Sequence, residues 1–393
     1  DKLNLNVKDT GTTTFRPPFV PISIGAFAGR YVGIEWAPIR RTPMHDLHLR
    51  DGAIMTDAGD WKRPWYYPKS NENIDLAYVR EAKTTRNSIG MVDVSTLGKI
   101  LIQGNDASLF VDRLYINTFD KLKIGKAKYG IMLRDDGFVL DDGTTWRINE
   151  NEYFMTTTTA QASKVMSFME ELLQFRWPNL DVHLTSVSDN WGAFSIAGPK
   201  TREILAKIFT KINFSKDSFP PMMIKEGTLK FGLQRVDYKL ARISFSGELA
   251  WEVYVEANYA SAIWDLFSNE IKNLNGCLYG MEALGTLRIE KGHVTAAELD
   301  GRVSLEDAGF SKMVSSKKNF IGSVLRKRPE FLNNNRAKLV GIYPKDKSKI
   351  FGSGSILCEK DKISGFGVGW VTAVTHSPVF NHWIGLGFIS GGH

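Results

Sequence analysis

Residues 129–146 read Tyr129-Gly-Ile-Met-Leu-Arg-Asp-Asp-Gly-Phe-Val-Leu-Asp-Asp-Gly-Thr-Thr-Trp146. Two apolar runs flank Arg134-Asp-Asp-Gly137, and Asp-Gly supplies the positive φ that a tight reversal requires, so the segment predicts a β-hairpin. Two adjacent carboxylates, Asp141 and Asp142, follow the second run. Neighbouring side chains on a strand point to opposite faces, so at most one of the two acids faces any given cavity. The alternative is a strand-end pair in which both acids are solvated.

The composition is typical of a soluble globular protein. The chain has 393 residues, of which 43% are hydrophobic and 24% charged, enough for two or three domains. The net charge of +7 is small for this length, and no zinc-finger or RNA-binding pattern occurs, which argues against nucleic acid as a partner. No apolar run reaches about 18 residues, so no membrane span is expected. Two distant cysteines, Cys277 and Cys358, fit a reducing, cytoplasmic location.

The order of predicted elements indicates several parts. Residues 1–40 are rich in Thr, Pro and Gly and predict a leader arm or linker. The chain does not begin with Met, which predicts a fragment of a longer protein. A strand ending at Gly104 and a strand ending at Ala197-Gly-Pro199 are each followed by a helical pattern. This recurrence predicts an α+β fold of two related subdomains around a central cleft, over residues 41–330. Short strands and glycine turns predict a small, barrel-like all-β domain over residues 336–393, which has no evident closing strand.

Several kinds of site are disfavoured by spacing. His45 and His48 lie three apart, but no third ligand is nearby, so no metal site is predicted. The glycine-rich segments 352–354 and 365–369 do not connect a strand to a helix, so they do not support a dinucleotide site. No Walker loop, Gly-x-Ser-x-Gly elbow or Cys-His catalytic set occurs.

The remaining candidates are three acids and an arginine, namely Asp142, Glu248, Glu252 and Arg288. Glu252 lies inside the apolar run Trp251–Val255, where a carboxylate requires a hydrogen-bond donor. A ligand ring with N–H and NH₂ groups would supply one, and Arg288 would serve equally as a structural ion pair. Arg288 could instead bind a ligand carboxylate. The residues alone leave these alternatives open.

Seven motifs occur in the order found in folate-binding aminomethyltransferases, the glycine-cleavage T-protein family, and the chain resembles that family over about residues 41–390. The motifs are Thr42-Pro-Met-His-Asp-Leu-His48, Gly59-Asp-Trp61 with Pro64, Val92-Asp-Val-Ser-Thr-Leu-Gly98, Gly137-Phe-Val-Leu-Asp-Asp142, Ala197-Gly-Pro199, Ser246-Gly-Glu248 with Glu252, and Leu287-Arg-Ile-Glu290.

Other segments resemble the branch of this family that forms the C-terminal, folate-binding half of alpha subunits in heterotetrameric sarcosine oxidases. They are Thr14-Phe-Arg-Pro-Pro-Phe19, Lys128-Tyr-Gly-Ile-Met-Leu133, Met155-Thr-Thr-Thr-Thr159 and Ile243-Ser-Phe-Ser-Gly-Glu-Leu-Ala250. The resemblance implies tetrahydrofolate as ligand and beta, gamma and delta subunits as partners. It places FAD, FMN and NAD only in a preceding half that is missing here, or in the partner subunits.

The resemblance also assigns roles to polar residues. Asp142 matches the catalytic aspartate beside the folate nitrogens that take up the one-carbon unit. Glu252 matches the glutamate that holds the pterin ring. Arg288 matches an arginine of the folate pocket.

Five further residues match the walls of that pocket. Tyr129 and Trp146 match aromatic positions, and Trp146 replaces a residue that is usually Tyr. Phe245 also stands where T-proteins have Tyr, so a hydroxyl contact is lost. Met55 and Tyr67 match the early wall, in a region where the loop before Trp61 differs in length.

The implied activity is one-carbon transfer. Oxidation of an N-methyl amino acid elsewhere gives an imine or formaldehyde, and tetrahydrofolate takes up that carbon as 5,10-methylenetetrahydrofolate. Two alternatives remain: a T-protein-like aminomethyltransferase or other folate-dependent demethylase, and a non-catalytic scaffold with the same fold.

Overall fold

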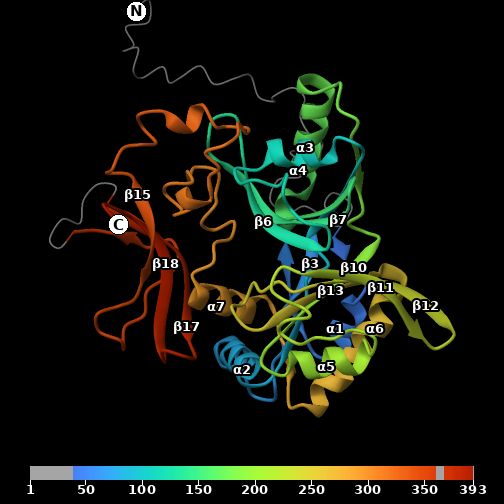
Figure 1. Cartoon of the computed structure of the whole chain (residues 1–393). Coiled ribbons are helices and arrows are strands. Elements are labelled where there is room, and N and C mark those ends of the chain that lie inside the picture. The colour runs from blue at the N-terminus through green and yellow to red at the C-terminus, as the bar shows by residue number, and fades with distance from the viewer. Residues whose placement is uncertain (1–38, 360–366, 393) are drawn as a thin grey trace, which may run out of the picture. The chain divides into compact units, whose positions relative to one another are not determined.

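The computed structural model describes residues 39–359 and 367–392 (Figure 1). The chain divides into residues 1–40 and a compact unit of residues 41–393. Nearly all of the predicted leader arm therefore lies outside the described residues. The boundary predicted between residues 330 and 336 stays a prediction. Within the described ranges, no helix is both long and apolar enough to cross a bilayer.

A five-stranded sheet is built around the 129–146 hairpin, in the order β6-β7-β8-β5-β9. The hairpin prediction is confirmed, because β6 and β7 pair antiparallel with Tyr129 opposite Thr144. Gly137 closes the turn with φ 89°, and a Cβ there would lie 2.7 Å from the Arg326 nitrogen, so both conformation and space require glycine. The elements are β5 (Gly98–Gln103), α3 (Ala107–Leu114), β6 (Lys126–Leu133), β7 (Val139–Asn149), β8 (Glu152–Thr157), η3 (Thr159–Gln161), α4 (Ala162–Glu171), η4 (Leu172–Arg176) and β9 (His183–Ser186).

A six-stranded sheet follows, in the order β11-β12-β13-β10-β4-β14. Its central strand β13 alternates side chains between two faces and is largely buried, which suits a strand covered on both sides. The elements are β4 (Gly90–Asp93), β10 (Trp191–Ala197), α5 (Thr201–Ile208), β11 (Ile224–Phe231), β12 (Gln234–Ala241), β13 (Ala250–Glu256), α6 (Ala257–Asn273) and β14 (Cys277–Leu278).

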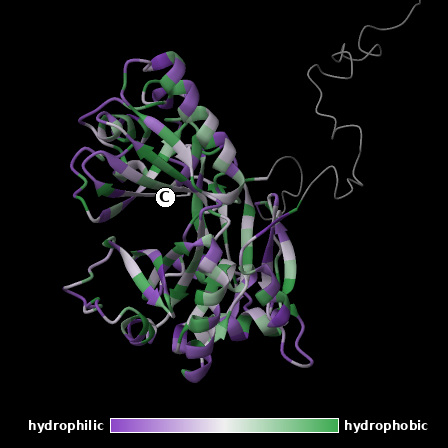
Figure 2. Cartoon of the chain, turned by 90° about the vertical axis from the view of Figure 1, so that its right-hand side faces the viewer, coloured by the Kyte–Doolittle hydropathy of each residue, from purple (hydrophilic) through white to green (hydrophobic). Residues whose placement is uncertain are grey.

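The two sheets repeat one topology. In each, a first strand leads into a helix and then into three consecutive strands, the last of which pairs back with the first. A second helix follows each set, α4 after β8 and α6 after β13. Figure 2 shows hydrophobic residues along the strands and many hydrophilic residues on helices and connecting loops. The predicted α+β fold of two related subdomains is confirmed.

Aromatic side chains pack between the two sheets. Trp146 of β7 and Phe154 of β8 contact Tyr254 of β13, with ring centroids 5.0 and 5.6 Å apart. All three side chains are completely buried in one core cluster. Because side chains two and four apart on a strand share a face, Asp142 lies on the face of β7 that carries Trp146, and Glu252 on the face of β13 that carries Tyr254. The packing of the two sheets therefore turns both acids toward the space between them.

Further elements join these sheets. Residues 40–66 contain a three-stranded sheet, ordered β1-β3-β2. Trp65 of β3 donates a 2.8 Å hydrogen bond to Glu282 at the start of α7, and α7 lies against α2. Gly292, with φ 76°, ends α7 in the left-handed conformation that glycine adopts most readily. The elements are β1 (Arg40–Arg41), α1 (His45–Arg50), β2 (Ile54–Ala58), β3 (Trp61–Tyr66), α2 (Ile74–Asn87) and α7 (Met281–Lys291).

A C-terminal sheet of four strands has the order β15-β18-β17-β16 and agrees with the predicted all-β segment. It packs on α7, where Thr286 and Thr375 of β17 lie 2.6 Å apart through their hydroxyls. Thr372 of β17 donates a 2.6 Å hydrogen bond to buried Glu298. The elements are η5 (Ser311–Met313), η6 (Leu325–Lys327), β15 (Ala337–Ile342), β16 (Ile356–Leu357), β17 (Gly369–Ser377) and β18 (His382–Ser390).

Candidate functional site

The two adjacent acids of β7 point to opposite faces, as strand alternation predicts. Asp141 is 4% exposed and accepts hydrogen bonds from the Thr158 backbone N–H (3.2 Å) and hydroxyl (2.7 Å). Asp142 is partly exposed and accepts a 2.6 Å hydrogen bond from the Tyr129 hydroxyl. Asp141 therefore holds the end of β8, whereas Asp142 faces the second sheet, and the alternative of two solvated acids is wrong.

Burial raises the pKa of both acids. The pKa of Asp142 is about 6, because burial outweighs the hydrogen bond from Tyr129. The pKa of Asp141 is about 8, because burial and the neighbouring charge of Asp142 outweigh the bonds from Thr158. Asp142 is therefore mostly ionised at neutral pH and has acceptor capacity beyond the one bond from Tyr129.

Glu252 has a similar setting on β13. The Tyr254 hydroxyl, two residues further along the same strand face, donates a 2.9 Å hydrogen bond to its carboxylate. Burial raises the pKa of Glu252 to about 7, partly offset by the Tyr254 hydrogen bond and by the charge of Lys99. Lys99 is fully buried and donates to the carbonyls of Ser95 and Leu97 among others. Each site acid thus has one tyrosine hydroxyl as a described donor.

The rings of Tyr129, His293 and Phe245 form a chain of contacts near Asp142 and Glu252. The His293 ring lies 4.9 Å from Phe245, edge to face, and 5.9 Å from Tyr129. Phe245 lies in the loop before β13, the strand that carries Glu252, and the Tyr129 hydroxyl donates to Asp142. Tyr129 thus contacts Asp142 directly and Phe245 through the His293 ring, while Glu252 lies on β13, the strand that follows Phe245. The ligand contacts of these residues stay predictions. A pocket of about 500 Å³ lies beside Tyr129.

Arg288 is engaged within the protein. Its Nη1 forms a 2.7 Å ion pair with Glu298 and donates a 3.1 Å hydrogen bond to the His293 carbonyl. Both charged side chains are almost completely buried. Glu298, and not Glu252, is the described partner of Arg288, so the alternative in which Arg288 forms a structural ion pair with Glu252 is wrong. Arg288 fixes the backbone of His293, and its own contact with a ligand stays a prediction.

Three other predicted wall residues lie apart from the Asp142 contacts. Trp146 is 0% exposed and packs behind Asp142 on the same strand face, so it supports the site from within the core and is not an open wall. Tyr67 is buried, and its hydroxyl lies 3.0 Å from His48 Nδ1, in a separate network. Met55 is a partly exposed residue of β2 opposite Pro64.

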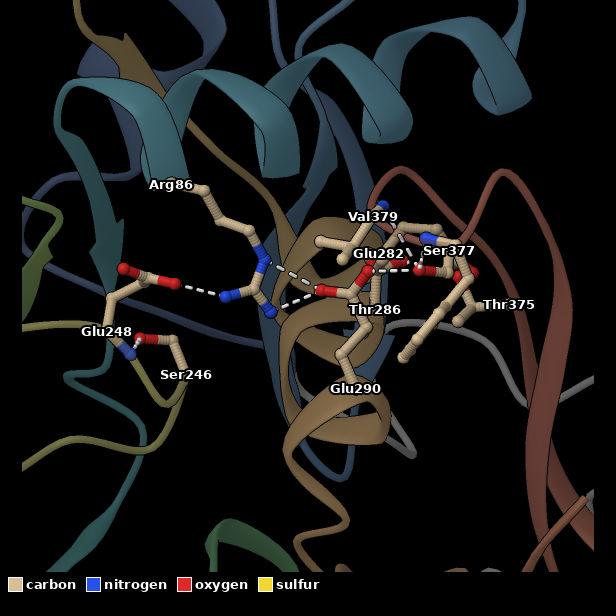
Figure 3. Close-up of polar contacts among 10 residues, drawn as sticks. Arg86, Ser246, Glu248, Glu282, Thr286, Glu290, Thr375, Ser377 and Val379 are labelled. Carbon is tan, nitrogen blue, oxygen red and sulfur yellow. Dashed lines mark hydrogen bonds and ion pairs between the residues drawn. The ribbon is translucent and has the colours of Figure 1, made fainter.

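Glu248 belongs to an ion-pair network that Figure 3 shows. Arg86 of α2 bridges Glu248 and Glu290, and Ser377 donates to the other oxygen of Glu290. The network joins α2, α7, the loop before β13 and the end of β17. The Ser246-Gly-Glu248 motif therefore fixes the loop that carries Phe245, which is a structural role.

Two residues of the site escaped the sequence analysis. Tyr254 is two residues from Glu252, and strand alternation alone would have identified it as a same-face donor. His293 has no comparable signal, because a single His after a helix-ending glycine is common. Burial and the charges of Lys291 and Arg288 lower the pKa of His293 to about 4, so its ring is neutral at physiological pH. Among the residues that the structure describes, no group of three metal-ligating side chains occurs.

Residues 44–318 match the GCVT N-terminal domain. The chain belongs to this family. An aminomethyltransferase structure from Bartonella henselae, 20% identical, superposes with a TM-score of 0.76 over 90% of both chains and supports the same fold. Aminomethyltransferase of Thermotoga maritima is 27% identical over 354 residues, 90% of each chain.

More similar sequences are sarcosine oxidase alpha subunits. The Rhizobium meliloti subunit is 43% identical over 388 residues, and the Corynebacterium sp. (strain U-96) subunit is 40% identical over 392 residues. Each alignment covers 98% of this GCVT-family chain but only 39–40% of the relative. The chain thus spans about two fifths of the length of these relatives. The recognised resemblance to sarcosine oxidase alpha subunits is confirmed at the level of sequence similarity.

Proposed function

We propose that the chain binds tetrahydrofolate between its two sheets and forms 5,10-methylenetetrahydrofolate from a one-carbon unit released by oxidation of an N-methyl amino acid. The observation that carries the proposal is the pair of partly satisfied carboxylates, Asp142 and Glu252, on facing strands among aromatic rings. A pterin ring presents N–H and NH₂ donors and a flat apolar surface, and this chemistry fits two acceptors beside rings.

The reaction gives Asp142 a defined task. With formaldehyde as donor, the carbon gains bonds to both folate nitrogens, its oxygen leaves as water, and the two nitrogen protons end on that water. A fixed carboxylate can accept a proton from a nitrogen, return it to the leaving oxygen, and stabilise positive charge as it develops, which contributes roughly 10²–10⁴ in rate. Tyr129 orients the Asp142 carboxylate through its hydrogen bond. Glu252 would hold the ring that carries the reacting nitrogens.

The test is Asp142→Asn in the intact enzyme, with Asp217→Asn as control because Asp217 is exposed. We expect folate-dependent methylene formation to fall roughly 10²–10⁴-fold while amine oxidation continues and formaldehyde accumulates. The control should keep full activity. Unchanged methylene-folate formation in Asp142→Asn, with the variant folded, would exclude the proposed role.

Aminomethyl transfer to tetrahydrofolate is a second candidate. It is supported by the match to aminomethyltransferases, which covers 90% of both chains. An assay that offers the chain an aminomethyl donor and, separately, formaldehyde distinguishes the two. The first proposal requires activity with formaldehyde or the imine. Only the first proposal implies subunit partners, and under it FAD, FMN and NAD would be bound outside this chain.

A further inference from the structure

His293 follows α7, and the fold fixes its backbone on both sides. Its N–H donates to the Arg288 carbonyl at 2.9 Å, and its own carbonyl accepts a hydrogen bond from Arg288 Nη1 at 3.1 Å. The Arg288 guanidinium is paired with buried Glu298, which also accepts the hydroxyl of Thr372 in β17. The position of the His293 side chain is therefore set by contacts within the protein.

The His293 ring lies beside two aromatic residues of the proposed site. It meets the Phe245 ring edge to face, with centroids 4.9 Å apart and planes at 88°, and it lies 5.9 Å from the Tyr129 ring. The Tyr129 hydroxyl donates to Asp142, and Phe245 lies in the loop before the strand that carries Glu252. The imidazole is thus placed near the surroundings of both acids.

Neither ring nitrogen of His293 has a hydrogen-bond partner among the residues that the structure describes. The side chain is only partly exposed, yet neither nitrogen is completely enclosed, so a ligand can reach them. The buried rings of His48 and His382 differ, because each has a partner at both nitrogens. Those partners are Asp93 and Tyr67 for the first ring, and Lys347 and the Trp383 carbonyl for the second.

The His293 ring is neutral at physiological pH. Burial and the charges of Lys291 and Arg288 lower its pKa to about 4. A neutral imidazole has one N–H donor and one acceptor nitrogen, whereas an ionised carboxylate has acceptors only. The tyrosine hydroxyls beside the two site acids already donate to those acids. His293 therefore adds an N–H donor that the fold does not use.

A pterin ring has a polar edge that two carboxylates cannot satisfy completely. Beside its N–H and NH₂ donors it carries a lactam carbonyl, and a carboxylate repels that oxygen instead of binding it. We propose that His293 is a ligand-binding residue, which donates its ring N–H to the lactam carbonyl of the pterin. The inference rests on the proposed function, because it takes the ring to be held by Asp142 and Glu252.

The test is His293→Phe in the intact protein, which keeps a flat ring beside Phe245 and Tyr129 and removes both nitrogens. We expect tetrahydrofolate affinity, measured by calorimetric titration, to fall roughly 10-fold, because one hydrogen bond is lost and a carbonyl is left unpaired. His293→Asn and His293→Gln place an amide NH₂ near the former Nδ1 and Nε2 positions, so one of them should restore most of the affinity. His183→Phe, at an exposed position of β9, is the control and should bind as wild type does.

A ¹³C label at the lactam carbonyl separates a direct contact from a structural effect. A hydrogen bond donated to a carbonyl oxygen moves the resonance of its carbon downfield. The resonance of the bound ligand should therefore lie further upfield in His293→Phe than in wild type. It should return toward the wild-type position in the amide variant that restores binding, and His183→Phe should leave it in place.

Wild-type affinity in His293→Phe overturns the inference, and so does a carbonyl resonance that this substitution does not move. It is also overturned if neither amide variant binds more tightly than His293→Phe. Each of these results leaves the proposed function standing, provided that the wild-type protein binds tetrahydrofolate. If the wild-type protein does not bind tetrahydrofolate, the proposed function fails and this inference fails with it.

Discussion

Two carboxylates of this chain, Asp93 and Asp142, differ in how many hydrogen-bond donors the fold supplies to them. Asp93 accepts hydrogen bonds from the Thr42 hydroxyl (2.6 Å), His48 (2.9 Å) and the Ser95 backbone N–H (2.8 Å). Asp142, in contrast, has one described donor, the Tyr129 hydroxyl. The first acid is saturated by the fold, whereas the second keeps acceptor capacity for something the fold does not supply.

The pKa values express the same contrast. Burial alone raises the pKa of Asp93, but the hydrogen bond and charge of His48, with the other donors, outweigh it and lower the pKa to about 2. At Asp142 burial prevails and the pKa rises to about 6. Burial likewise raises the pKa of Glu252, to about 7. A buried acid whose pKa is raised is a costly feature for stability, and such acids concentrate at functional sites.

The largest expected effect is on stability at the saturated site. Asp93→Asn removes the acceptor shared by Thr42 and His48, so we expect the free energy of unfolding at pH 7 to fall by about 3–5 kcal/mol. Since the folded pKa lies below the ordinary 3.8, the contribution of Asp93 is present above that value and is lost as pH falls toward 2. Urea unfolding at pH 7 and pH 3 measures both. Asp60→Asn, at an exposed position, is the control. If Asp93→Asn is as stable as wild type, the hydrogen bonds to Asp93 do not stabilise the fold, and Asp93 and Asp142 do not differ in the way described.

The next effect is on binding at the unsaturated site. Glu252→Gln keeps the shape but replaces one acceptor with an NH₂ group that opposes ligand donors. Because hydrogen bonds to charged groups contribute about 1.5–3 kcal/mol, we expect tetrahydrofolate affinity to fall roughly 10–100-fold with little loss of stability. Calorimetric titration measures the affinity, and Glu203→Gln on an exposed helix position is the control. Undiminished affinity would show that Glu252 does not hold the ligand.

The sequence predicted the parts of the site that follow from local rules. The 129–146 hairpin, the opposite faces of Asp141 and Asp142, and the need of Glu252 for a donor all depend on strand alternation and turn chemistry. Local rules do not predict the partner of Arg288. Glu298 lies ten residues later, beyond the end of α7, and only tertiary packing brings its carboxylate to 2.7 Å from Arg288 Nη1. The sequence likewise predicts Trp146 on a pocket wall, because a sequence position does not reveal that Tyr254 and Phe154 cover its ring.

A third prediction separates the two neighbours on β7. The folded pKa of Asp141, about 8, lies above its ordinary 3.8, so its contribution to stability is full below 3.8 and is lost as pH rises through about 8. Asp141→Asn replaces the carboxyl with a group that does not titrate, so the variant does not lose stability in this way as pH rises. We expect the stability of the variant relative to wild type to increase by about 1–3 kcal/mol between pH 4 and pH 8. Chemical unfolding at several pH values measures the difference, with Asp217→Asn as control. A difference independent of pH would mean that Asp141 is ionised in the fold, like Asp93.

The smallest expected effect is a change of pH dependence at the site itself. Tyr129→Phe keeps the ring beside His293 and removes only the hydroxyl that donates to Asp142. Because that hydrogen bond lowers the Asp142 pKa, its loss should raise the pKa above the wild-type value of about 6, by up to about 1 unit. The rate of methylene-folate formation should rise with pH as Asp142 ionises, and the midpoint of this rise should move upward in the variant.

The pH profile of single-turnover methylene transfer, with amine oxidation measured in parallel, tests this shift. Tyr343→Phe removes an exposed hydroxyl and should leave the midpoint in place. A profile that moves in Tyr129→Phe and disappears in Asp142→Asn would assign the titration to Asp142. An unmoved midpoint would mean that another group controls the rate, and the unsaturated carboxylate would then be a consequence of the fold instead of a catalytic feature.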